Sequence, residues 1–151
     1  EIGRLVGTLD RSVALVYARC STAKQVENLE RQVGRLLEYA NTTGYAVELY
    51  KDIGSGLNEN RKQFGKLMKR LVDTDVACVI VEYRDRLSRY GFETFRRYCE
   101  SLKVSVIVLK DAEAKEFEQE FAEDVVALIA SYSARLYGRR GAAGRKKKNA
   151  T

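Results

Sequence analysis

The sequence of 151 residues contains no histidine, and this absence removes a large class of reactions from consideration. Without an imidazole, the chain cannot build a Ser-His-Asp or Cys-His catalytic arrangement. Its three cysteines are an odd number without CxxC spacing, so neither a disulfide framework nor a zinc site is indicated, and a reduced cytoplasmic location is expected. Apolar runs such as residues 125–130 are far too short to cross a bilayer, and no signal peptide is evident, so no membrane partner is expected.

The common phosphate-binding loops are also missing. The P-loop pattern fails at Asn60, where glycine is required, and the segment around Gly54 and Gly56 lacks the third glycine of a dinucleotide loop. Cys20 is followed six positions later by Val26 rather than by the arginine of cysteine phosphatases. No tight acidic cluster is expected at the strand ends. The sequence therefore predicts no ATP, nicotinamide or metal cofactor.

Charge is unevenly distributed along the chain. The net charge is +6, residues 111–124 are acidic, and residues 139–151 are strongly basic. We expect an N-terminal linker over 1–12, one folded domain over 13–138, and a basic flexible tail over 139–151 that adds salt-sensitive affinity for phosphates. This pattern fits a nucleic-acid partner but does not establish one. Because the chain begins with glutamate rather than methionine, we expect it to be part of a longer protein.

Hydrophobic periodicity predicts alternating strands and helices. Three short apolar runs and one alternating segment predict strands, at 13–18, 76–81, 104–109 and 45–50. Helical spacing of apolar residues predicts helices at 26–40, 64–71, 92–102 and 116–137, and Gly44 is expected to end the first. The alternation predicts an α/β fold with an open, mostly parallel sheet flanked by helices and a long C-terminal helix.

Polar side chains follow three of the predicted strands, at the edge where ligands bind in open α/β sheets. Arginine suits phosphate at such an edge, because its planar fork donates two parallel hydrogen bonds and keeps its charge. Asp85 and Arg89 are four residues apart, so a helical turn would place them on one side. The candidates are Arg19, Ser21, Asp52, Arg61, Asp85, Arg86 and Arg89.

Three motifs resemble those of the serine recombinases, the superfamily of resolvases and invertases. Residues 17–22, YARCST, followed by Gln32, look like the nucleophile motif, although Cys20 stands where the family usually has valine. Arg61 resembles the family's mid-domain phosphate arginine, and residues 85–89, DRLSR, resemble its DRLxR motif. The resemblance covers nearly the whole chain after about residue 12.

Two further segments, residues 51–61 and 133–138, are similar to the serine-transposase branch found in insertion elements. In that branch the DNA-binding module precedes the catalytic domain. A chain that starts without methionine and stops soon after its last helix agrees with this order.

The resemblance implies a mechanism. Ser21 would attack a DNA phosphodiester, displace the 3′ hydroxyl and form a 5′-phosphoserine, without metal or ATP. The phosphate would be held by four arginines, and Asp85 would orient an arginine or take part in proton transfer, whereas Gln32 and Asp52 would be supporting residues. The family also implies a homodimer that assembles into a tetramer during strand exchange. The four arginines are Arg19, Arg61, Arg86 and Arg89. The identity of the general base is left open.

Simpler interpretations exist for each residue. Ser21 could cap the first helix, Arg61 and Arg86 could form ordinary surface ion pairs, and Asp52 could be a turn residue. Gly54 and Gly56 are interpreted as sources of loop mobility. The last helix carries an apolar stripe that is either core or partner surface: Phe117, Phe121, Val125, Leu128, Tyr132 and Leu136.

Two other functions stay open. A site-specific resolvase or invertase would share the chemistry but carry its DNA-binding module after the catalytic domain. An α/β module that binds nucleic acid without cutting it would not need Ser21.

Overall fold

The computed structural model describes residues 11–58, 60–111 and 117–150. Its sheet has the strand order β2-β1-β3-β4, and all three strand pairings are parallel. The strands are β1 (Val13–Cys20), β2 (Ala46–Ile53), β3 (Val76–Val81) and β4 (Ser105–Val108). Because the strands are parallel, their carboxyl ends meet at one edge, as the sequence predicts. The α/β fold with a parallel sheet is confirmed.

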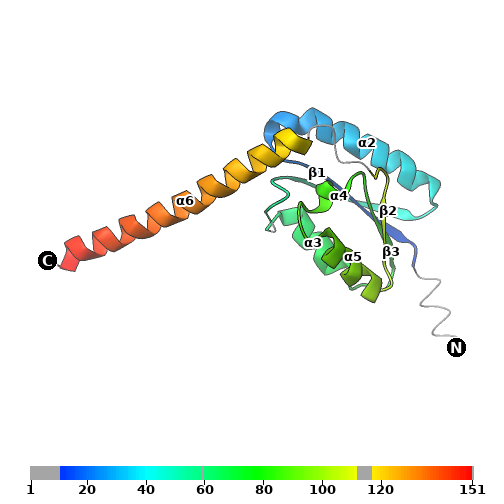
Figure 1. Ribbon diagram of the computed structural model, residues 1–151. Coiled ribbons are helices and arrows are strands. Elements are labelled where there is room, and N and C mark those ends of the chain that lie inside the picture. Colours follow the sequence, from blue (N-terminus) through cyan, green and yellow to red (C-terminus); the bar gives the residue numbers. More distant parts are fainter. Residues whose placement is uncertain (1–10, 59, 112–116, 151) are drawn as a thin grey trace.

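Helices cover both faces of this sheet (Figure 1). In Figure 1, α2 lies on one side of the strands, and α3 and α5 lie on the other. The helical elements are η1 (Ala23–Gln25), α2 (Val26–Thr42), α3 (Lys62–Arg70), α4 (Arg84–Leu87), α5 (Phe92–Ser101) and α6 (Phe117–Ala150). Gly44 has φ +79°, a left-handed conformation that glycine tolerates, and it follows the end of α2 as predicted.

The central strand β1 divides two apolar cores. All of its eight residues are buried, and successive side chains point to opposite faces. Leu15 and Tyr17 belong to the core shared with α3 and α5, whereas Val16 and Cys20 pack in the core beneath α2. Cys20 is therefore a buried apolar side chain, in keeping with the valine it replaces.

Helix α6 extends away from the sheet and its covering helices (Figure 1). It was expected to end at Tyr137, but it continues to Ala150, so the predicted end of the helix is wrong and residues 139–150 are helical. The reason is composition, because this segment contains alanine, arginine and lysine, which favour helix, and no proline. The predicted linker over 1–12 lies largely outside the described residues.

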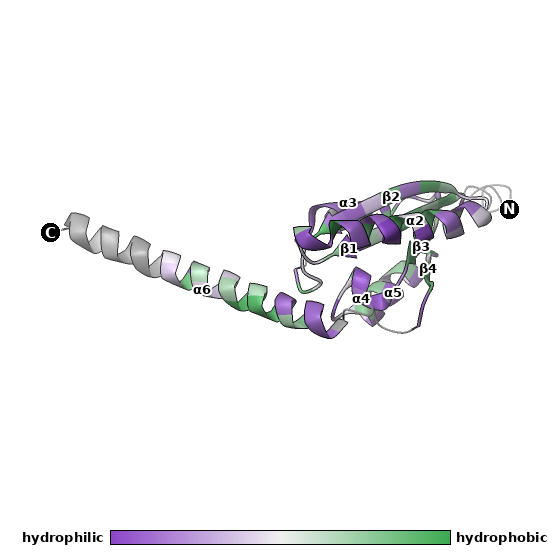
Figure 2. Cartoon of the chain, turned by 90° about the horizontal axis from the view of Figure 1, so that it is seen from above, coloured by the Kyte–Doolittle hydropathy of each residue, from purple (hydrophilic) through white to green (hydrophobic). Residues whose placement is uncertain are grey.

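The later residues of the apolar stripe of α6 lie outside the domain core. Leu128 and Tyr132 are 53% and 67% exposed, and Leu136 is also exposed. Figure 2 shows apolar residues along the middle of α6, beyond the body of the domain. None of the helices in the described part of the chain combines the length and the hydrophobicity that a membrane span requires.

Strand β2 and the segment after β3 differ from the sequence prediction for local reasons. Strand β2 continues past Tyr50 to Ile53, because it pairs with β1 as far as Cys20. The segment after β3 forms the single helical turn α4, which places Asp85 and Arg89 on one side as the spacing suggests.

Candidate functional site

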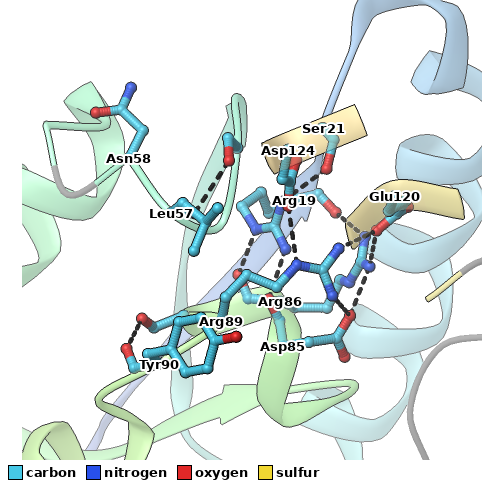
Figure 3. Close-up of polar contacts among 12 residues, drawn as sticks. Arg19, Ser21, Leu57, Asn58, Asp85, Arg86, Arg89, Tyr90, Glu120 and Asp124 are labelled. Carbon is cyan, nitrogen blue, oxygen red and sulfur yellow. Dashed lines mark hydrogen bonds and ion pairs between the residues drawn. The ribbon is translucent and has the colours of Figure 1, made fainter. Parts of the chain in front are cut away.

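Arg19 lies at the carboxyl end of β1 and organises the candidate site. It is completely buried, and its Nη1 donates a hydrogen bond of 3.1 Å to the Oγ of Ser21 (Figure 3). The same Nη1 donates to the carbonyl of Gly54 at 3.0 Å, while Nε donates to the carbonyl of Arg86 at 2.9 Å. Nη2 donates to the carbonyl of Asp85. The guanidinium therefore joins the three segments that follow β1, β2 and β3.

The surroundings of Arg19 lower the pKa of its guanidinium group. Burial, and then the neighbouring guanidinium groups of Arg86, Arg61 and Arg89, lower the pKa of Arg19 to about 10. At neutral pH the side chain still carries its positive charge. A cation is thus held in hydrogen-bond contact with a hydroxyl at the edge of the sheet.

Ser21 is partly exposed, and its hydroxyl is not a helix cap. The N-cap residue of η1 is Thr22, which precedes the helix and makes no capping hydrogen bond with its side chain. The Oγ of Ser21 accepts from Arg19, and its backbone N–H donates to Gln25 at 3.1 Å. The helix-cap interpretation is therefore wrong.

Gln32 fixes the end of β1 from helix α2. Its Oε1 accepts from the backbone N–H of Arg19 at 3.0 Å, and its Nε2 donates to the carbonyl of Arg19 at 3.1 Å. Both bonds are buried. The amide of Gln32 thus pairs with the two backbone groups of Arg19, as the backbone of a neighbouring strand would. This geometry agrees with a supporting role.

Asp52 anchors helix α3. Its carboxylate accepts from the backbone N–H groups of Gln63 and Phe64 at 3.0 and 2.9 Å, at the positive end of the helix. It also accepts from the hydroxyl of Tyr17 at 2.8 Å, and burial raises the pKa of that tyrosine well above its usual value. Asp52 is 9% exposed, so it is an internal anchor rather than an exposed turn residue.

Arg61 joins the loop after β2 to the segment after β3. It is 5% exposed, and its Nη1 donates to the hydroxyl of Tyr17 at 2.8 Å, while Nη2 donates to the carbonyl of Leu87. Its guanidinium carbon lies 4.5 Å from the ring centroid of Phe64, a cation–π distance. An ordinary surface ion pair is therefore excluded, and the predicted phosphate contact of Arg61 stays a prediction.

Two acidic residues from α6 complete the site (Figure 3). Glu120 accepts from both Arg86 and Arg89, and Asp124 accepts from the Nε of Arg89 at 2.8 Å. The Oδ2 of Asp85 accepts from Arg86 at 2.8 Å and from Arg89 at 3.1 Å. All five side chains are buried, at 6% exposure or less, so the surface ion-pair interpretation is wrong for Arg86 too.

These contacts keep Arg86 charged. Burial alone would lower the pKa of Arg86, but the hydrogen bond to Glu120 and the charge of Asp85 raise it above its usual value. The arginine therefore stays a cation inside the domain.

Sequence reasoning missed Glu120 and Asp124. They lie in the acidic segment and are four residues apart, so a helix places both on one face. That spacing could have identified a paired acidic face on the last helix. It could not have identified the arginines opposite, which lie more than 30 residues earlier in the chain.

Gly56 has a steric role that differs from the predicted mobility. A Cβ at this position would lie 2.7 Å from the Cγ of Arg89 and 2.9 Å from the Nη2 of Arg19. The backbone of Gly56 also accepts a hydrogen bond from the N–H of Arg89 at 3.2 Å. Glycine is thus required because two site arginines pack against the loop. At Gly54 a Cβ would make an ordinary contact of 3.5 Å with Arg61.

The geometry suits an anionic ligand that carries oxygen atoms. A hydroxyl and a buried cation lie in contact, and three further arginines, Arg61, Arg86 and Arg89, follow β2 and β3 at the same edge of the sheet. Within the described residues, no group of three or more histidine, cysteine, aspartate or glutamate side chains could hold a metal ion. The carboxylates of the site are instead paired with arginines.

Comparisons with known proteins place this geometry in context. A family model described as the resolvase N-terminal domain matches residues 14–151. The chain is 32% identical over 135 residues to a putative resolvase of Acanthamoeba polyphaga mimivirus, a match that covers 89% of this chain and 69% of the viral protein. An uncharacterised protein of Mycobacterium tuberculosis is 31% identical over 131 residues, with 86% of this chain and 42% of that protein covered. The chain thus spans about two thirds of one relative and less than half of the other.

Solved structures agree with these matches. The C-terminal catalytic domain of ISC1926 TnpA, described as an IS607-like serine recombinase, is 41% identical with a TM-score of 0.74, and 85% of this chain and 88% of that chain are covered. A serine recombinase from Sulfolobus solfataricus is 38% identical with a TM-score of 0.69, covering 86% of this chain and 88% of that chain.

Proposed function

This chain belongs to the resolvase family of serine recombinases, with IS607-like transposases among its structural neighbours, and from that premise we propose that Ser21 cuts and rejoins DNA during transposition of an insertion element. The observation that supports this proposal best is the contact between Ser21 and the buried Arg19. The hydroxyl is partly exposed and lies beside a cation at the sheet edge where ligands of this fold class bind.

The proposed reaction is a transesterification. The Oγ of Ser21 attacks the phosphorus of a DNA phosphodiester as it loses its proton, and the bond from phosphorus to the 3′ oxygen breaks. The 3′ oxygen gains a proton and leaves as a hydroxyl, while the 5′ phosphate stays bonded to Ser21. Attack by a 3′ hydroxyl on the phosphoserine reverses these steps and rejoins DNA. One ester replaces another, so no ATP is needed, and no metal is proposed.

The arginines supply electrostatic stabilisation. Negative charge grows on the phosphate oxygens in the transition state, and fixed cations in a buried site offset it at little reorganisation cost. Arg19 is in place beside the nucleophile, whereas Arg86 and Arg89 are bound to Glu120 and Asp124. Those two arginines must therefore exchange carboxylate oxygens for phosphate oxygens when DNA binds.

Asp85 is suited to either of its expected roles. Its Oδ2 orients Arg86 and Arg89. Its Oδ1 is buried and has no hydrogen-bond partner within the described residues. We assign the orienting role to Oδ2 and transfer of the leaving-group proton to Oδ1.

Members of this family act on DNA and oligomerise. For this chain we propose a homodimer that assembles into a tetramer during strand exchange. The exposed apolar residues of α6, including Ile129 and Tyr132, are the surface that supports this assembly.

A denaturing gel tests the proposal. Incubation of the protein with duplex DNA from the element end should give a protein–DNA adduct that survives denaturation. Ser21→Ala should abolish it, and Ser101→Ala, a change in the exposed part of α5, should not. An equally abundant adduct in Ser21→Ala would refute the proposal.

The match to putative resolvases supports one alternative, a resolvase that recombines two fixed sites. Such an enzyme would convert a plasmid with two copies of its site into two circles. The proposed transposase would instead join element ends to a new target.

A further inference from the structure

A cavity of about 310 Å³ lies on the α2 side of the sheet edge. Its wall includes Cys20 at the end of β1, Glu82 just after β3 and Lys110 just after β4. Helix α2 contributes Arg31 and Arg35, one helical turn apart. The cavity thus adjoins the site through Cys20, the residue that precedes the nucleophile.

The wall of this cavity has an excess of positive charge. Four basic and two acidic side chains line it. Glu82 is occupied by Arg35 through two hydrogen bonds of 2.6 and 2.9 Å, and Glu120 is shared between two arginines of the site. Within the described residues, Arg31 and Lys110 take part in no ion pair, so their charges are available to a ligand.

Arg86, which lines the cavity, has a buried hydrogen-bond donor without a partner among the described residues. Its side chain is 4% exposed, and the donor is its Nε–H. Buried N–H groups of this kind are nearly always paired in folded proteins. An acceptor oxygen from a ligand would satisfy it.

Arg86 also connects the cavity to the nucleophile. Its Nη1 donates to the carbonyl of Arg19 at 2.9 Å, and Arg19 donates to Ser21. Cys20 is the last residue of β1, and Ser21 follows it directly in the chain. Their Cα atoms are only about 3.8 Å apart. A DNA strand that crosses the end of β1 therefore passes both positions.

We propose that this cavity binds a second, uncleaved backbone phosphate of the same DNA, through Arg31, Lys110 and the Nε–H of Arg86. The proposal rests on the proposed function, since it takes DNA to be the substrate. A phosphodiester fits the observations because it presents one negative charge and several acceptor oxygens to a wall of guanidinium and ammonium groups.

The test compares two double variants on DNA. Arg31→Ala with Lys110→Ala removes two cations of the cavity wall, and Lys69→Ala with Arg97→Ala removes two exposed cations from α3 and α5. Equal thermal unfolding temperatures would show that both variants fold. All measurements are made in native and Ser21→Ala backgrounds, so that binding is measured even where no adduct forms.

We expect the cavity variant to need roughly tenfold more DNA for half-saturation, whereas the control variant should bind like the native chain. The slope of log K against log salt should fall in magnitude by about 0.9 for the lost phosphate contact. The maximal rate of adduct formation at saturating DNA should be unchanged. Half-saturation and slope equal to the native values would overturn the proposal.

Chemically modified DNA identifies the phosphate. A series of duplexes is prepared, each with a single uncharged methylphosphonate linkage at a different position near the cleavage site. The native chain should bind one of them more weakly, namely a duplex whose linkage lies at an uncleaved position. The cavity variant should show no further loss at that position. Equal losses at every position in both proteins would overturn the proposal.

Inorganic phosphate distinguishes a free anion from DNA. If phosphate binds the native chain but not the cavity variant, while DNA binding is the same in both, the cavity serves a free phosphate and the proposal is wrong. Absence of any adduct with normal DNA binding would refute the cleavage function and leave the phosphate site standing.

Discussion

At the scale of single residues, the site depends on buried arginines with two kinds of partner. Backbone carbonyls hold Arg19 and Arg61, whereas carboxylates hold Arg86 and Arg89. Arg19 donates to carbonyls from the segments after β2 and β3 and to the hydroxyl of Ser21, and Gln32 forms hydrogen bonds with both backbone groups of Arg19. Close packing around these side chains leaves no space for a methyl group at Gly56. Even a small increase in side-chain volume at Gly56 should therefore slow catalysis.

We expect Gly56→Ala to reduce the rate of adduct formation at least tenfold. The added Cβ would displace Arg89 and Arg19, whose positions are set by buried hydrogen bonds. Gly65→Ala is the matched control, because a Cβ there meets nothing within 4 Å. Since Gly65 lies inside α3, alanine should stabilise the protein by about 0.5–1 kcal/mol and leave the rate unchanged. Equal rates in the two variants would contradict the steric role of Gly56.

The sequence predicted most of these residues but not all of their contacts. Ser21, Arg19 and Arg86 follow strands, and parallel strands bring their carboxyl ends together, so their meeting could be predicted. The pairing of Arg89 with Asp124 could not, because it depends on how α6 docks rather than on a local pattern. Close approaches such as that of Gly56 depend on packing, which spacing alone does not specify.

At the scale of elements, α6 is attached to the domain mainly through charge. Glu120 and Asp124 bind Arg86 and Arg89, and Phe121 lies 6.5 Å from the ring of Tyr90. Buried pairs of this kind are costly to break, because the remaining charge stays out of water.

We expect Asp124→Ala to loosen the first turns of α6. Removing this carboxylate leaves Arg89 buried with fewer partners, a change that costs about 3 kcal/mol in comparable buried pairs. Hydrogen exchange of the amides in residues 118–126 should accelerate at least tenfold. Glu118→Ala, which removes an exposed carboxylate from the same helix, should leave exchange unchanged. Unchanged exchange in Asp124→Ala would show that other contacts hold the helix.

A second charge cluster joins α3 to the sheet and predicts a pH dependence. Arg70 donates to Glu48 on β2 and to Asp75 just before β3, and these hydrogen bonds lower the pKa of both carboxylates. Because the folded pKa values are lowered, this stabilisation is present above the unfolded values near 4 and is lost as the pH falls through the folded values.

Arg70→Ala should therefore lower the free energy of unfolding by about 1 kcal/mol at pH 7, since solvent screens these partly exposed groups. The difference from the native chain should disappear as the pH falls from 5 towards 2, as measured by urea denaturation. A difference that stays constant over this range would exclude the ion pairs as its cause.

Element boundaries show where sequence reasoning succeeds and fails. The buried strands β1 and β3 are short apolar runs, and such runs have few alternatives in a parallel sheet. The end of α6 was misplaced because glycines and a change to basic composition were interpreted as a tail, while the intervening alanine, arginine and lysine continue the helix.

At the scale of the whole molecule, the exposed apolar face of α6 is a surface that the described part of the chain leaves uncovered. Val126, Ile129, Tyr132 and Tyr137 are all exposed by more than half. Together with the family's oligomeric behaviour, this face supports self-association of the chain.

We expect Ile129→Lys combined with Tyr132→Lys to shift the protein towards monomers. Charged side chains at these positions would make burial of the face unfavourable. Sedimentation velocity should show the dissociation constant rise at least tenfold. Ala134→Lys, which lies towards the other side of the helix, is the control and should have little effect. Association equal to that of the native chain would place the interface elsewhere.

The central claim is a covalent bond between Ser21 and a 5′ phosphate of DNA, and mass spectrometry of the trapped adduct tests it most directly. Tryptic cleavage after Arg19 and Lys24 releases residues 20–24, which contain both Ser21 and Thr22. After nuclease digestion, fragmentation of this peptide should place a nucleotide, linked through its 5′ phosphate, on Ser21. A nucleotide on Thr22, on another peptide, or linked through its 3′ phosphate would contradict the account.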